Sequence, residues 1–231
     1  MKLLVTTRSD DSFSSVSAYT HPFIKAYANK VGADFSILSE NVDGLRSHYR
    51  ILKCKELLYE YDRVLVIDSD AIVMPYTPNL FELVPYEMIA TVLEDKGSRQ
   101  TIRRERIRQI QEKLGDVGWI EGYINTGVFL VSKCHQRIFD YKIEDLPIDD
   151  DTGVDDCYLG FQIHKYKFPI YELPFQYNTM SMYTEAWNGS PNRWDSWVIH
   201  HAGMGHFPGM NRHEVIKQDA LLVKKYYEKD V

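Results

Sequence analysis

The chain has 231 residues, of which 44% are hydrophobic and 26% charged, enough for one domain with a sizeable core. Its formal net charge of −6 argues against a nucleic-acid partner. Three scattered cysteines match no disulfide or zinc pattern, and the first apolar run is too short for a signal peptide or a membrane span. We therefore expect a cytoplasmic globular protein whose only membrane contact would be peripheral.

The first forty residues predict a strand, a helix and a second strand. Residues 2–6 and 34–38 are apolar segments, and residues 13–27 carry apolar side chains at spacings of three and four. Pro22 should kink this helix or divide it in two. In doubly wound sheets the first strand-to-helix loop faces a nucleotide. We therefore predict nucleotide contacts from the backbone of this loop and from Arg8, the alternative being a simple connecting loop.

A helix over residues 47–59 should follow, with Ser47 as its cap. Arg50 lies near its start, and the helix leads directly into the next strand. A planar guanidinium can bind a phosphate or a carboxylate with two parallel hydrogen bonds. Arg50 is therefore a candidate phosphate contact, although such a cation is usually only solvated.

The most informative stretch is a continuous apolar run, residues 64–67, that ends in Asp68-Ser69-Asp70. Such a run is typical of a strand buried on both faces in a parallel sheet. Two carboxylates at the carboxyl end of that strand suit Mg²⁺ or Mn²⁺ holding a diphosphate. A solvated turn is the alternative, because Asp and Ser also favour turns.

Two later strands begin or end in polar residues. Residues 88–93 form a strand that ends at Glu94-Asp95, and Asn125-Thr126-Gly127 leads into another apolar strand. Gly127 lets a neighbouring group approach the backbone, to which Asn125 offers both donors and an acceptor. The basic segment between them, residues 96–113, predicts an exposed surface helix, with a mobile acceptor-side segment as the alternative.

The last third of the chain adds an acidic pair and a histidine loop. Asp155 and Asp156 open a helix, where acidic residues also simply favour the helix dipole. A final strand, residues 197–201, runs through His200 into a glycine-rich loop with Gly203 and His206. A terminal helix capped by Asn211 completes the chain.

Alternating strands and helices predict a three-layer α/β fold around a central, mostly parallel sheet, in a single domain. Asp68, Asp70 and His200, with His201 as the alternative histidine, would meet at strand ends as a metal site with open positions for phosphate. The glycine signatures of P-loop and Rossmann nucleotide sites do not occur after the first strand.

The order of these motifs resembles the GT-A glycosyltransferases, in particular family 8 with its glycogenin-like and bacterial galactosyltransferase members. The similarity covers most of residues 1–210. It rests on the segments 50–53, 61–70 with its D-x-D, 123–130 with its N-x-G, 154–156, 173–178 and 200–206. It implies a Rossmann-like GT-A fold with residues 1–125 as the nucleotide-sugar-binding half, 126–210 as the acceptor-side half and 211–231 as a C-terminal helix.

The resemblance implies metal-dependent transfer of a sugar from a nucleotide-diphosphate sugar, with a UDP-sugar as the expected donor, to a hydroxyl of a saccharide or glycan. Asp70 and His200 would hold Mn²⁺ or Mg²⁺, and Asp68 would contact the metal or the ribose. Asp155 and Asp156 would be the catalytic pair beside the transferred sugar. The implied donor contacts are Thr6, Arg8, Arg50, Asp68, Ser69, Asn125, Gly203 and His206.

Two positions depart from the family pattern. His206 stands where a phosphate-binding lysine is usual, and Asp156 stands where a glutamine is usual. An extra carboxylate could act as a general base in an inverting enzyme, whereas the resemblance to family 8 favours retention. The rival functions are a nucleotidyltransferase, whose glycine-rich basic loop does not follow the first strand, and a catalytically silent sugar-binding or scaffold protein.

Overall fold

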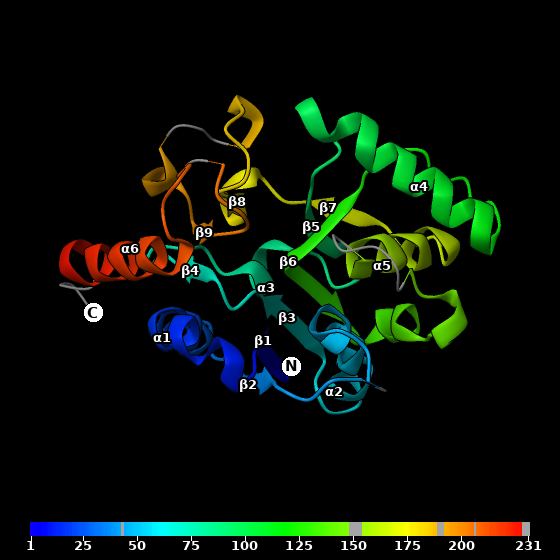
Figure 1. Cartoon of the computed structure of the whole chain (residues 1–231). Coiled ribbons are helices and arrows are strands. Elements are labelled where there is room, and N and C mark those ends of the chain that lie inside the picture. The colour runs from blue at the N-terminus through cyan, green and yellow to red at the C-terminus, as the bar shows by residue number, and fades with distance from the viewer. Residues whose placement is uncertain (43, 148–153, 189–191, 206, 228–231) are drawn as a thin grey trace.

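A computed structural model describes residues 1–42, 44–147, 154–188, 192–205 and 207–227 (Figure 1). Its centre is a six-stranded sheet in the order β2-β1-β3-β6-β5-β7. The pairs β1–β2, β1–β3 and β5–β7 are parallel, and β6 runs antiparallel to both β3 and β5. The strands are β1 (Leu3–Arg8), β2 (Asp34–Leu38), β3 (Arg63–Ile67), β5 (Ile89–Leu93), β6 (Ile124–Ser132) and β7 (Ile170–Glu172).

Side chains of the central strands alternate between two separate cores, as the pleat of a strand requires. Val64 and Val66 of β3 pack into the core on the side of α2, α4 and α5, whereas Leu65 and Ile67 pack on the side of α1 and α3. The helices are α1 (Ser14–Lys30), α2 (Cys54–Glu60), α3 (Leu80–Leu83), α4 (Gln100–Leu114), α5 (Val154–Lys165) and α6 (Arg212–Tyr227). The expected three-layer α/β architecture is thereby confirmed.

A second, three-stranded sheet has the order β4-β9-β8 and brings the predicted metal ligands at the ends of β3 and β9 towards each other. Its strands are β4 (Ala71–Val73), β8 (Thr179–Met180) and β9 (Val198–His200). The antiparallel register of β4 and β9 places Ala71 opposite His200, so the turn after β3 lies against the end of β9. Helix α6 (red in Figure 1) covers this sheet together with α1, through an apolar cluster that includes Phe23, Ile199 and Val223.

One of the two alternatives for Pro22 does not hold, and the helix predicted over residues 47–59 was wrong in part. Pro22 lies inside a continuous α1, so it does not divide this helix. Residues Ser47–Lys53 form a 3-10 helix without a side-chain cap, and α2 begins only at Cys54. The four consecutive residues 49–52 are all buried, which a helix with one apolar face does not permit. Among the described residues, no helix combines the length and apolarity needed to span a bilayer.

Candidate metal centre

The predicted ligands Asp68, Asp70 and His200 lie together at the end of β3. His200 Nε2 is 3.2 Å from Asp70 Oδ1 and 3.6 Å from Asp68 Oδ2. One ligand atom from each residue falls within 4.8 Å of the others. Two carboxylates and an imidazole at this spacing fit a divalent cation with open coordination positions. Metal binding itself stays a prediction.

The His200 ring is oriented by a chain of buried amides. Asn178 Nδ2 donates to Asn125 Oδ1 at 2.7 Å, so Asn178 Oδ1 is the group that faces His200 Nδ1, also at 2.7 Å. This arrangement puts the ring proton on Nδ1 and leaves the Nε2 lone pair facing the carboxylates, as a metal ligand requires. Asn125 therefore acts in this structure by orienting His200.

Gly127 makes room for this ring. A Cβ at Gly127 would lie 2.5 Å from His200 Cε1, closer than side-chain atoms approach. The glycine of the N-x-G segment is thus required by close contact with His200.

The charged groups of the candidate metal centre shift one another's pKa values. Burial alone would raise the pKa of Asp70, but the facing His200 imidazole and Arg212 bring it well below its usual range. Burial alone would lower the pKa of His200, but Asp70 and Asp68 raise it. The site thus favours an ionised Asp70 facing a positive charge, whether a proton on the imidazole or a bound cation.

His201, the neighbouring histidine, faces away from the three ligands. Its Nδ1 lies 3.0 Å from the backbone oxygen of Asp70, and its Nε2 lies 3.0 Å from Asp219 Oδ2 of α6. Asp219 also accepts two 2.8 Å hydrogen bonds from Arg193. His200 is therefore the histidine that fits a metal-ligand role, and His201 links the turn after β3 to α6.

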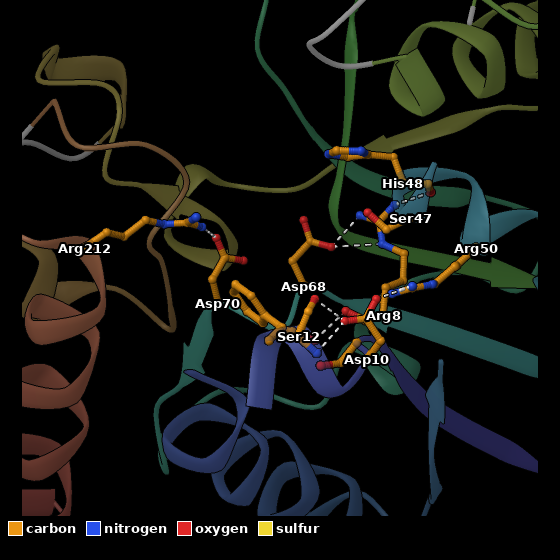
Figure 2. A pocket seen from close by; sticks show the side chains of 12 residues that line it. Arg8, Asp10, Ser12, Ser47, His48, Arg50, Asp68, Asp70 and Arg212 are labelled. Carbon is orange, nitrogen blue, oxygen red and sulfur yellow. Dashed lines mark hydrogen bonds and ion pairs between the residues drawn. The ribbon is translucent and has the colours of Figure 1, made fainter. Parts of the chain in front are cut away.

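Arg8 connects the candidate metal centre to the acidic pair. From the end of β1 it forms ion pairs with both Asp68 and Asp155 (Figure 2 shows the first). Asp155 also accepts a 2.9 Å hydrogen bond from the Thr126 hydroxyl. Arg8 was predicted to contact a nucleotide; in this structure its guanidinium is held by two carboxylates.

Asp156 has different partners from Asp155. Its Oδ1 accepts a 2.7 Å hydrogen bond from the Thr126 backbone N–H, and it does not line the cavity beside the metal ligands. Burial, together with Asp155 and Glu94, raises the pKa of its carboxyl to about 8. Of the predicted catalytic pair, Asp155 is thus the one linked to Arg8 and Asp68.

Glu94 forms a second buried ion pair, with Arg103 of α4. Its Oε2 accepts hydrogen bonds from Tyr183 at 2.9 Å and from Asn125 at 3.2 Å. Burial raises the pKa of Glu94, partly offset by Arg103. Arg103 therefore departs from the solvated surface predicted for residues 96–113.

A cavity of about 240 Å³ opens beside the cluster, at the carboxyl ends of β1 and β3 (Figure 2). Its rim includes the first strand-to-helix loop and the 3-10 helix that precedes α2. Its lining residues are Arg8, Ser9, Asp10, Ser12, Phe13, Ser47, His48, Arg50, Asp68, Ser69, Asp70 and Arg212.

The other predicted donor contacts are only partly at this cavity. Arg50 and Ser69 line it, but Arg50 is paired with Asp10. Thr6 is buried in β1, donates to the Ser36 carbonyl at 3.2 Å and does not line the cavity. The Gly203 carbonyl accepts a 2.8 Å hydrogen bond from Ser181, and His206 lies outside the described residues.

Arg212, the first residue of α6, is a site residue that sequence reasoning missed. Its guanidinium pairs with Asp70 and its Nε donates to the His201 carbonyl at 2.7 Å. Its only sequence signal is its place after the capping Asn211, which says nothing about distance from Asp70.

No protein-family model and no curated protein sequence matches the chain. Solved structures do match. One, a glycosyltransferase involved in the glycosylation of the major capsid of PBCV-1, has a TM-score of 0.59 at 14% identity, over 96% of this chain and 100% of that one. The chain has the fold of a glycosyltransferase. The galactosyltransferase LgtC, in complex with donor and acceptor sugar analogs, matches at a TM-score of 0.57 and 15% identity, over 95% of each chain.

A third match, the glycosyltransferase GlyE of Streptococcus pneumoniae, has a TM-score of 0.56 at 14% identity and covers 100% of this chain but 64% of its own. The similarity extends along almost the whole chain in all three comparisons. It confirms the GT-A fold expected from the motif order. At such identities it is a likeness of fold, and the chemistry must be argued from the site.

Proposed function

We propose that this protein is a metal-dependent glycosyltransferase that moves a sugar from a nucleotide-diphosphate sugar, with a UDP-sugar as the expected donor, to a hydroxyl of a saccharide or glycan. The observation that carries the proposal is the meeting of Asp68, Asp70 and His200 beside an arginine-lined cavity at the carboxyl ends of β1 and β3. Open α/β sheets bind ligands at this edge. The similarity in fold to the galactosyltransferase with bound donor and acceptor analogs also supports the proposed sugar transfer.

Asp68, Asp70 and His200 would hold Mn²⁺ or Mg²⁺ at the cavity. When bound, such a cation neutralises the charge that develops on the leaving diphosphate. Arg8 keeps Asp68 oriented through its 3.1 Å Nε contact, and the Ser69 hydroxyl ties the same turn to the Arg8 carbonyl at 2.6 Å. These contacts would hold the candidate ligands in position before the donor arrives, so little reorganisation would be needed on binding.

Asp155 and Asp156 are the proposed pair on the side of the transferred sugar. Asp155 would accept a hydrogen bond from a sugar hydroxyl while held by Arg8 and Thr126. Asp156, which holds the Thr126 backbone, would be the base only in an inverting enzyme. A carboxyl whose pKa is about 8 retains its proton at neutral pH, which supports retention.

In the reaction, the bond between the anomeric carbon and the diphosphate oxygen breaks. A bond to the acceptor oxygen forms, and the acceptor hydroxyl passes its proton to the departing diphosphate oxygen in a retaining enzyme, or to Asp156 in an inverting one. The anomeric configuration of the product, measured by NMR, tests retention directly, with Asp156→Asn as the companion variant.

The test of the function is incubation with Mn²⁺ and a panel of UDP-, GDP- and CMP-sugars, with and without saccharide acceptors. We expect slow hydrolysis of at least one donor, stimulation by an acceptor, and loss of both with EDTA or in Asp70→Ala. Pyrophosphate release from a nucleoside triphosphate and a sugar 1-phosphate would instead indicate a nucleotidyltransferase. Silence with every donor would favour a sugar-binding or scaffold protein.

A further inference from the structure

Three arginines line the cavity beside the candidate metal centre, and they differ in how fully they are engaged. Arg8 is held by two carboxylates with a side chain 8% exposed, and Arg50 is held by Asp10 and Asn41 with a side chain 5% exposed. The side chain of Arg212 is 35% exposed. Among the described arginines of the lining, Arg212 is therefore the one best placed to reach a ligand.

Arg212 approaches the centre from the side opposite Arg8 and Arg50 (Figure 2). The two oxygens of Asp70 are divided between its two neighbours: Oδ1 faces His200 at 3.2 Å and Oδ2 is paired with the Arg212 guanidinium. A cation held by Asp70 and His200 would thus share a carboxylate with a guanidinium. The cation and the Arg212 guanidinium, bound to the two oxygens of one carboxylate, would repel each other.

A bound diphosphate removes this conflict, because it brings negative charge and phosphate oxygens to the metal. A guanidinium matches phosphate oxygens in bidentate geometry as well as it matches a carboxylate. Only the Arg212 side chain needs to move, because α6 itself is held by other contacts. Asp219, two turns further along α6, is bound to His201 at 3.0 Å and to Arg193.

The geometry points to Arg212 as an exchangeable cation, which holds Asp70 while no divalent cation is bound and transfers to the donor's diphosphate when cation and donor bind together. This inference rests on the proposed function and adds to it a diphosphate contact from the C-terminal helix. It makes cation and diphosphate binding cooperative, and such coupling must be the same in both directions.

The consequence is a pair of effects with opposite sign. In Arg212→Gln, Mn²⁺ alone should bind about tenfold more tightly, because the competing guanidinium is gone. Inorganic pyrophosphate, measured at saturating Mn²⁺, should bind about ten- to a hundredfold more weakly, the usual value of a charge-assisted hydrogen bond. In Arg212→Lys, which keeps the charge, Mn²⁺ affinity should stay close to that of the wild type and pyrophosphate affinity should be intermediate.

The experiment measures Mn²⁺ binding by electron paramagnetic resonance and pyrophosphate binding by calorimetry, with Lys217→Gln as the control for loss of a positive charge on α6 away from the cavity lining. Pyrophosphate as the probe removes any dependence on the nucleobase or sugar. Opposite shifts in Arg212→Gln, with no shift in Lys217→Gln, support the inference.

Unchanged or weaker Mn²⁺ binding in Arg212→Gln would overturn the inference and leave Arg212 a structural partner of Asp70, while the proposed function stands. If the wild type itself binds no Mn²⁺, both the proposed metal centre and this inference fail. The two failures are therefore distinguishable in the same titration.

Discussion

Replacing Asp156 by Asn should stabilise the protein more at pH 8 than at pH 5. Burial raises the pKa of the Asp156 carboxyl to about 8, from an ordinary value of 3.8. Between these values the folded protein holds a proton that the unfolded chain releases, so stability falls as the pH rises through this window. Asn resembles the protonated acid in shape and can still accept the Thr126 hydrogen bond, and it has no proton to lose.

The size of the stability change follows from the interval between the two pKa values of Asp156, in the unfolded and the folded state. One pH unit is worth about 1.4 kcal/mol, so ionisation of Asp156 could destabilise the folded state by at most about 6 kcal/mol. Relaxation and water entry around a buried charge reduce such penalties. We expect Asp156→Asn to gain on the order of 2 kcal/mol over the wild type at pH 8.

The assay is urea unfolding of both proteins at pH 5 and pH 8, compared as differences so that other titrating groups cancel. Asp155→Asn is the companion variant: it breaks an ion pair with Arg8 and should lose roughly 2 kcal/mol at pH 5, and less at pH 8 because loss of the Asp155 charge also lowers the pKa of Asp156. The reasoning is refuted if Asp156→Asn has the same effect on stability at pH 5 and pH 8, or if it destabilises the protein at pH 8.

Three further predictions concern the supports of the candidate metal centre. Asn178→Ala removes the 2.7 Å partner of His200 and should weaken Mn²⁺ binding about ten- to a hundredfold in a folded protein, measured by calorimetry. Gly127→Ala places a Cβ 2.5 Å from His200 and should abolish Mn²⁺ binding; unchanged binding would mean that His200 is not a ligand. Asp219→Asn weakens the contact with His201 and should lower the free energy of unfolding by about 1–3 kcal/mol in urea titrations, whereas an unchanged value would contradict the proposed anchoring of α6.

The sequence allowed the candidate ligands Asp68, Asp70 and His200 to be predicted because each lies at a strand end, and strand ends can be located from local hydrophobic patterns. Similarly local signals predicted three other features: the first strand-helix-strand unit, the acidic turn after β3 and the helix cap at Asn211. These features needed no knowledge of which segments pack together.

The remaining site residues depend on long-range packing. Arg212 reaches Asp70 only because α6 lies against α1 and the small sheet, through contacts such as those of Phe23 and Val223. Arg50 was expected to be available to phosphate, but nothing local shows that Asp10, forty residues earlier, pairs with it. The different partners of Asp155 and Asp156 are likewise supplied by Arg8 and Thr126, which lie on strands distant in the sequence.

The most direct test of the account is the anomalous diffraction of crystals grown with Mn²⁺ and UDP, recorded at the manganese absorption edge. The account predicts one strong peak within coordination distance of Asp68, Asp70 and His200, with the diphosphate beside it and Arg212 turned towards a phosphate oxygen. A peak at another place, or UDP bound with no manganese at these three residues, would contradict it.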